Sequence, residues 1–152
     1  MSTGEASHTA SRAIEASPTA IYAAFVDPAA LVQWLPPAGA VGAIEVFEPL
    51  PGGRFRMTLT FSSAVGKTSH DTDVVEGRFL ELVPAERIVQ AISFVSDDAA
   101  FGGAMTMTWT FTEAPGGACV TVLAENVPPG ISRADHERGM ASTLANLAGF
   151  LE

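Results

Sequence analysis

The sequence predicts an α+β protein in which a curved antiparallel sheet of six or seven strands grips one long C-terminal helix. Three observations predict this class. Helix-start signals occur within residues 17–37, apolar and polar residues alternate from residue 42 onward, and a helical spacing of apolar residues returns after Ser132. Alternation is typical of half-buried strands, and the final helix must lie on the sheet because nothing else offers enough apolar surface.

The chain begins with one expected strand and two short helices. Residues 8–16 are expected to form the strand that leads into the fold. Ser17-Pro18 and Asp27-Pro28 each place a capping side chain before a proline, which is typical of a helix start. They predict helices over about residues 18–25 and 28–34, and the second ends at the proline pair that follows it.

Five strands in the middle of the chain can be given bounds. The alternation is clearest at residues 53–61, where Phe, Met and Leu alternate with Arg and Thr, and at 104–112, where Met, Trp and Phe alternate with Thr. Each apolar face is expected to point into the core. The other three strands are expected at about residues 70–82, 87–95 and 118–125.

Proline followed by a small residue marks the turns between strands. Pro51-Gly52 and Pro115-Gly116 fit type II turns, in which glycine supplies the positive φ. Pro84-Ala85 marks a third turn, between the strands at about 70–82 and 87–95.

The last segment predicts a helix of about five turns. Ser132, with Asp135 three residues later, fits a capping box at its start. One face of the helix then carries an apolar stripe, made of Met140, Leu144, Leu147 and Leu151. A single helix cannot fill the concave face of six or seven strands. A cavity between helix and sheet is therefore expected on geometric grounds, and ligands bind in such cavities.

Composition and charge restrict the function. Eight basic and seventeen acidic residues give a net charge of −9, which repels nucleic acid and anionic lipid, so neither is an expected partner. No apolar run is long enough to span a membrane, and the first residues lack the pattern of a secretory signal. The lone Cys119 excludes an internal disulfide. We expect a cytoplasmic protein with a flexible tail at residues 1–7 and a single domain at 8–152.

The expected cavity predicts a ligand site with mainly apolar walls. The wall residues expected from the second short helix, the strand faces and the last helix are Trp34, Phe55, Met57, Met107, Trp109, His136 and Met140. Methionine side chains adapt to varied apolar shapes, so such a pocket would be pliable. A methionine-bearing core without a ligand explains the same methionines, and core packing is likewise the alternative for both tryptophans.

Titratable side chains show no catalytic constellation, and no catalytic residue is assigned. The three histidines, His8, His70 and His136, are scattered, so no metal site is expected. His136 continues the apolar stripe toward the start of the last helix, where it either reaches the pocket mouth or stays partly exposed. Asp71 and Asp73 share one strand face, and they would serve acid/base chemistry only if that face lined a dry pocket.

A known pattern runs through five stretches of the chain, at residues 17–37, 48–59, 74–89, 105–122 and 144–152. It resembles the SRPBCC (START/Bet v-like) superfamily and, within it, bacterial proteins similar to the activator of heat-shock-protein-90 ATPase. The resemblance implies a helix-grip fold with a central pocket and no obligatory cofactor. That family usually carries a Gly-Trp pair in its C-terminal helix. Here the pair is Gly139-Met140, which replaces an aromatic wall with a flexible thioether.

These observations lead to three functional hypotheses. The first is a protein that binds a small, mainly apolar molecule in the cavity between sheet and helix. The second, implied by the resemblance, is an interaction domain that contacts a chaperone or another large partner. The third is a cyclase- or dehydratase-type enzyme that uses His136 or a strand carboxylate as its acid or base. The low content of charged residues is also compatible with a homodimer.

Overall fold

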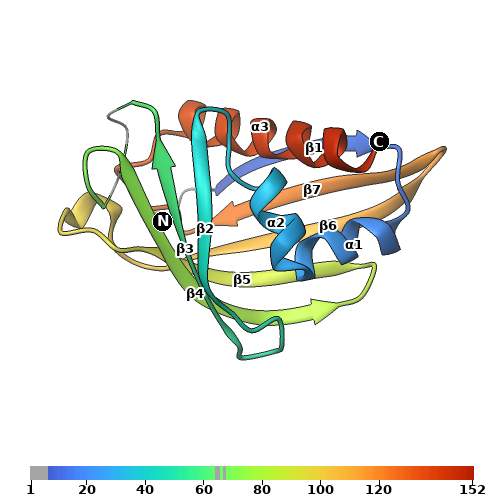
Figure 1. The fold of residues 1–152 in the computed structure, drawn as a ribbon, viewed down its shortest axis with the longest axis horizontal. Coiled ribbons are helices and arrows are strands. Elements are labelled where there is room, and N and C mark those ends of the chain that lie inside the picture. Colours follow the sequence, from blue (N-terminus) through green and yellow to red (C-terminus); the bar gives the residue numbers. More distant parts are fainter. Residues whose placement is uncertain (1–6, 64–65, 67) are drawn as a thin grey trace.

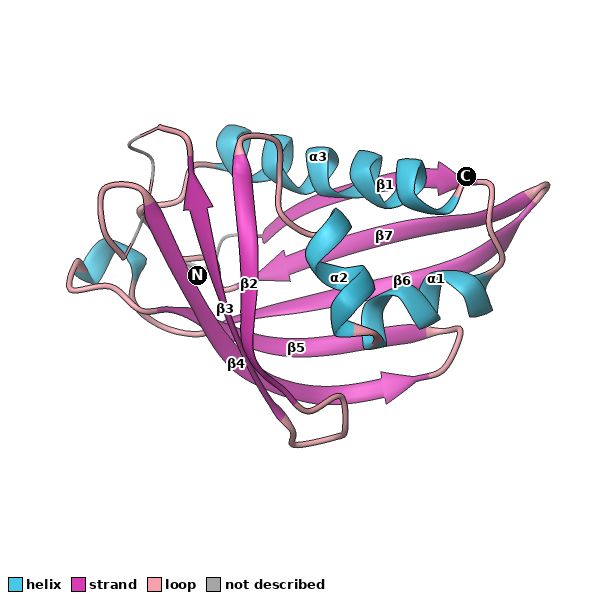
Figure 2. Cartoon of the chain, in the orientation of Figure 1, coloured by secondary structure: helices cyan, strands magenta, loops and turns pink. Residues whose placement is uncertain are grey.

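The computed structural model describes residues 7–63, 66 and 68–152, and these form one seven-stranded sheet with three α-helices (Figures 1 and 2). The strand order is β1-β7-β6-β5-β4-β3-β2, and every neighbouring pair is antiparallel. The predicted α+β class is confirmed. The elements are β1 (Ser7–Ile14), α1 (Pro18–Val26), α2 (Pro28–Trp34), β2 (Ala40–Phe47), β3 (Arg54–Phe61), β4 (Thr72–Val83), β5 (Arg87–Phe94), η1 (Ala99–Phe101), β6 (Met105–Ala114), β7 (Gly117–Glu125) and α3 (Arg133–Leu151).

The predicted strand bounds differ from the observed ones by one or two residues. The first strand was expected at residues 8–16 but begins at Ser7, which pairs with Glu125, and ends at Ile14. Residues 1–6 of the expected tail lie outside the described residues. Strand β2, which the alternation from residue 42 indicated without bounds, spans Ala40–Phe47. Within the described residues, no helix is both long enough and apolar enough to cross a membrane.

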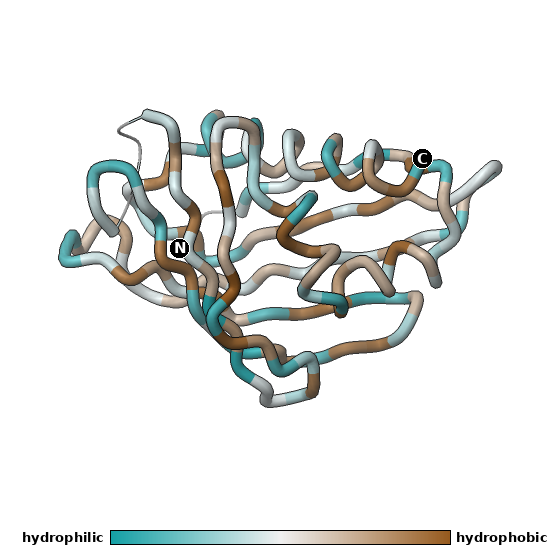
Figure 3. Tube along the Cα trace, viewed as in Figure 1, coloured by the Kyte–Doolittle hydropathy of each residue, from teal (hydrophilic) through white to brown (hydrophobic). Residues whose placement is uncertain are grey.

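The helices lie against different parts of the curved sheet. Helix α3 runs alongside β1, while β2, β3 and β4 curl away from it and give the sheet a concave face (Figure 1). Helix α2 contacts both β2 and α3, and α1 contacts β6. Apolar and polar residues alternate along the strands (Figure 3). Helix α3 thus packs on β1 and α2, and α2 also lies against β2.

The apolar stripe of α3 packs into the core as predicted. Leu144 and Leu147 are 1% and 0% exposed, and Met140 is buried as well. They join a core that includes Val120 and Val122 of β7, both 0% exposed. Full burial of one leucine side chain contributes about 1.5–3 kcal/mol, so this stripe fixes the helix on the sheet.

Short-range hydrogen bonds explain where the helices begin. The Ser17 hydroxyl oxygen accepts from the Ala20 backbone N–H at 3.1 Å, which caps α1. The Ser132 hydroxyl oxygen accepts from the Asp135 backbone N–H at 3.1 Å, which caps α3. The predicted N-caps at Ser17 and Ser132 are confirmed, because each satisfies one of the N–H groups that the first turn of a helix leaves without a partner. The Asp135 carboxylate, expected as the second member of a capping box, accepts instead from Arg138 at 3.2 Å.

The three predicted turns include one residue with a strained backbone. Gly52 and Gly116 have φ values of 81° and 79°, as type II turns require. In the β4–β5 turn the equivalent position is Ala85, with a φ of 62°, and the Glu86 N–H donates to the Val83 carbonyl at 3.0 Å. Alanine therefore occupies a left-handed conformation that glycine adopts without steric cost.

Replacing Ala85 with glycine is expected to stabilise the fold. Relief of the left-handed strain exceeds the added flexibility of glycine in the unfolded chain, so the free energy of unfolding should rise by about 0.5–1 kcal/mol. Urea denaturation measures it. The control is Ala43→Gly in β2, at an exposed position without a positive φ, where the same change should destabilise. Equal destabilisation in both variants would contradict the strain at Ala85.

Candidate functional site

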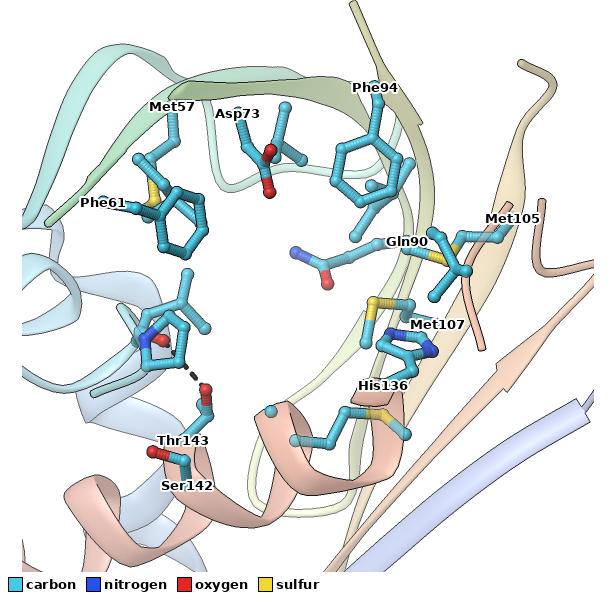
Figure 4. Close-up of a pocket in the computed structure, with 18 of the residues that line it drawn as sticks. Met57, Phe61, Asp73, Gln90, Phe94, Met105, Met107, His136, Ser142 and Thr143 are labelled. Carbon is cyan, nitrogen blue, oxygen red and sulfur yellow. Dashed lines mark hydrogen bonds between the residues drawn. The ribbon is translucent and has the colours of Figure 1, made fainter. Parts of the chain in front are cut away.

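A cavity of about 860 Å³ lies between α3 and the concave face of the sheet. Its walls come from five strands, β2 to β6, and from α1, α2 and α3 (Figure 4). Sites for small molecules are usually concave, mostly apolar and about 300–1,000 Å³ in volume. The cavity expected from the helix-and-sheet geometry is therefore present, at a size that accommodates a small organic molecule.

Six of the seven predicted wall residues line this cavity. They are Phe55 and Met57 from β3, Met107 and Trp109 from β6, and His136 and Met140 from α3. Met105 also lines the cavity, so four methionines surround one apolar space. Alternation along the strands explains this result, because side chains two residues apart point to the same face of a sheet.

Trp34 does not lie on the cavity wall. It is 0% exposed and packs edge-on against Phe25, with the ring centroids 4.6 Å apart. Its indole N–H donates to the Ala24 carbonyl at 3.1 Å. Phe25 does line the cavity and also contacts Trp109, at 5.0 Å between centroids. Trp34 is therefore a core residue that supports the wall from behind.

One face of α3 forms the helical side of the cavity. His136, Gly139, Met140 and Thr143 recur at the spacing of a single helix face, and all four line the space (Figure 4). The Thr143 hydroxyl donates to the Leu35 carbonyl at 2.9 Å, which ties α3 to the end of α2. A Cβ added at Gly139 would meet no atom within 4 Å. The centre of this face is therefore open.

A pair of histidines joins this helix face to β1. The Nδ1 atoms of His8 and His136 are 2.8 Å apart, and His8 is 2% exposed. One ring must donate and the other accept, so the contact cannot hold a proton on both Nδ1 atoms. Next to it, the Thr9 backbone N–H donates to Glu137 Oε2 at 2.9 Å. Sequence reasoning missed this pair because 128 residues separate its members.

Burial lowers the pKa of the His8 imidazole below its ordinary value of 6.5. The Arg133 guanidinium lowers the pKa further, and the Glu137 carboxylate opposes both effects. These groups and His136 face His8 from α3, while its register partner on β7 is Ala124. The fold thus favours neutral His8.

Acidification is expected to destabilise the protein through His8. Between the lowered pKa and 6.5, the folded protein binds fewer protons than the unfolded chain. The free energy of unfolding therefore falls as the pH drops through this window, and it keeps its full value above pH 6.5 as far as His8 is concerned. Urea midpoints at several pH values from 7.5 down to about 5 measure the change. His8→Asn should flatten this part of the profile, whereas His70→Asn, at an exposed position, should not. Identical profiles for wild type and His8→Asn would contradict the role of His8.

Two polar side chains on the sheet side of the cavity were not predicted as site residues. Asp73 of β4 is 2% exposed, and Gln90 of β5 is half-buried. Both point into the cavity (Figure 4). The alternation of side chains along each strand could have predicted these positions. Asp73 shares its face with the buried Phe79, and Gln90 lies between the buried Ile88 and Ile92. Asp71, the other carboxylate considered, lies before β4 and is 40% exposed.

The family of the chain follows from its match over residues 15–152 to the model described as Activator of Hsp90 ATPase homolog 1-like protein. The chain belongs to this family. It is 32% identical to a protein of solved structure from Chromobacterium violaceum, over 96% of both chains, with a TM-score of 0.85. No curated protein matches the sequence.

Two less similar solved structures have the same fold. The protein from Rhodobacter sphaeroides is 22% identical, over 98% of this chain and 93% of its own, with a TM-score of 0.80. The AHSA1-like protein from Aeromonas hydrophila is 17% identical, over 95% of this chain and 91% of its own, with a TM-score of 0.71. Membership in the Hsp90-activator-like family confirms the resemblance seen in the sequence and the helix-grip fold that it implied.

Proposed function

We propose that the protein binds a small, mainly apolar molecule in the cavity between α3 and the sheet. The observation that carries this proposal is a cavity of about 860 Å³ with four methionines and several aromatic rings in its walls. A well-packed core of this size leaves few voids larger than a water molecule. A large apolar space is therefore costly for the fold when it is not filled, and a ligand that fills it stabilises the protein.

Burial of apolar surface supplies the driving force for this binding. Each 100 Å² of apolar ligand surface removed from water contributes about 2.5 kcal/mol. Association costs about 4–15 kcal/mol in lost translational and rotational freedom, so the ligand must bury several hundred square ångströms. The methionines Met57, Met105, Met107 and Met140 all line the cavity. Their flexible side chains adapt to ligands of different outline, which favours a range of related molecules over one rigid shape.

A thermal-shift and native mass-spectrometry screen tests the proposal. The panel contains apolar metabolites, fatty acids and polyketide-like aromatic compounds, and N-phenyl-1-naphthylamine serves as a neutral fluorescent probe. Binding to the folded state should raise the melting temperature in proportion to the logarithm of ligand concentration. A panel without any shift, bound mass or displaced probe would contradict the proposal. In that case the partner hypothesis comes first, and the test is whether the protein stimulates the Hsp90 ATPase.

A second candidate function is catalysis in the same cavity. A cyclase- or dehydratase-type reaction requires a buried titratable group beside the space that holds the substrate. Asp73 meets this condition, and the half-buried His136 lines the same space. Any ligand from the screen should therefore be incubated with the protein and followed by mass spectrometry for loss or gain of water. Conversion that Asp73→Asn or His136→Ala abolishes would identify an enzyme. A ligand recovered unchanged would identify a binding protein.

A further inference from the structure

The orientation of the Gln90 side chain is fixed by its neighbour on β6. The Trp109 indole N–H donates to Gln90 Oε1 at 3.0 Å. An indole nitrogen only donates, so the oxygen of the amide must face Trp109. The two hydrogens of Nε2 are then directed into the cavity (Figure 4). The amide thus presents a hydrogen-bond donor of known position in a mainly apolar cavity.

Gln90 lies in apolar surroundings on both sides. Its register partners are Phe79 on β4 and Met107 on β6, and all three line the cavity. An amide that faces an apolar ligand loses its hydration without compensation, which costs free energy. A ligand with an oxygen at this point restores the hydrogen bond. Gln90 therefore distinguishes an oxygen-bearing molecule from a hydrocarbon of the same shape.

Charge adds a second criterion. The cavity walls are mainly apolar, and a carboxylate anion that enters them loses hydration, which costs free energy. The net charge of −9 also repels anions. Neutral ligands are therefore favoured over carboxylates.

We infer that the cavity selects neutral apolar molecules that bear a carbonyl or hydroxyl oxygen, with Gln90 Nε2 as the donor to that oxygen. This inference rests on the proposed function and names its ligand class. Hydrocarbons fill the cavity but leave the Gln90 amide without a partner. Fatty acids and other carboxylates are disfavoured because they lose hydration in the cavity and because the net charge of −9 repels anions.

Three near-isosteric compounds test the inference by displacement of N-phenyl-1-naphthylamine. They are 2-acetylnaphthalene with a carbonyl, 2-ethylnaphthalene without a polar group, and 2-naphthoate with a carboxylate. The ketone should displace the probe at a concentration about tenfold lower than the hydrocarbon, because the hydrocarbon has no oxygen to accept from the Gln90 amide. The carboxylate should be the weakest competitor of the three.

A variant assigns the preference for an oxygen-bearing ligand to one residue. Gln90→Met keeps the length of the side chain and should abolish the advantage of the ketone over the hydrocarbon. Gln33→Met, at an exposed position on α2, is the matched control and should preserve it. Urea denaturation establishes that each variant is folded at the assay temperature.

The outcomes separate this inference from the proposed function. Equal displacement by all three compounds, unchanged in Gln90→Met, would overturn the selectivity and leave apolar binding in place. Tighter binding of 2-naphthoate than of the ketone would overturn the preference for neutral ligands. Failure of the probe and of every compound to bind would overturn the proposed function and this inference with it. The predicted ranking, together with its loss in Gln90→Met alone, would support both.

Discussion

Replacing Trp34 with alanine is expected to lower the free energy of unfolding by about 3–5 kcal/mol. The side chain is 0% exposed and packs against Phe25, and its indole N–H satisfies the Ala24 carbonyl. Truncation leaves a cavity behind the wall and a buried carbonyl without its partner, and both effects destabilise. The loss is a large part of the about 5–15 kcal/mol by which domains are usually stable. Urea denaturation measures it.

Two further variants separate the structural role of Trp34 from ligand contact. Phe150→Ala removes an aromatic ring from the same protein at a position that is 40% exposed, and it should change stability by less than about 1 kcal/mol. Trp34→Phe keeps a ring in the core and should leave the affinity for N-phenyl-1-naphthylamine unchanged, because Trp34 does not line the cavity. A strong loss of affinity in a folded Trp34→Phe protein would contradict this placement.

Gly139→Trp is expected to weaken binding of N-phenyl-1-naphthylamine by at least about tenfold without lowering stability. Position 139 lies at the centre of the α3 face that lines the cavity, and a side chain there has open space in front of it. The new indole would occupy volume that the ligand needs. Loss of glycine from a helix interior contributes about 0.5–1 kcal/mol of stability, and burial of the ring adds to it.

The matched control for this variant lies on the same helix. Gly149 is exposed, and a Cβ added there also meets no atom within 4 Å, so Gly149→Trp introduces the same side chain outside the cavity. Its affinity for the probe should equal that of the wild type. Unchanged binding in Gly139→Trp would mean that the probe does not enter the space beneath α3.

Local chemistry explains which parts of the fold the sequence could predict. The Ser17 and Ser132 caps act within one helical turn, and the turn glycines act within four residues. The alternation of side chains along a strand is equally local. It correctly placed four residues on the concave face of the sheet, namely Phe55, Met57, Met107 and Trp109. Each of these predictions depends on neighbours in the chain, so no knowledge of the tertiary structure was needed.

The site residues that sequence reasoning misplaced or missed depend on contacts between distant segments. Trp34 is buried, but its burial does not say whether it contacts the cavity. Phe25 lines the cavity and packs against Trp34, which therefore lies in the core behind Phe25. The His8–His136 contact forms because α3 packs on β1. Asp73 and Gln90 lie at strand positions whose side chains point inward, but polar side chains are usually expected at the protein surface. Here they line an internal cavity instead.

Methionine methyl NMR tests the central claim most directly, because four of the five methionines line the cavity and the fifth, Met1, lies outside the described residues. Protein labelled with ¹³C at the methionine methyl groups is titrated with 2-acetylnaphthalene, and single Met→Leu variants assign the signals. We expect Met57, Met105, Met107 and Met140 to shift together with one dissociation constant, and to lose that response in Gly139→Trp. Binding that leaves these four signals in place would contradict a ligand site between α3 and the sheet.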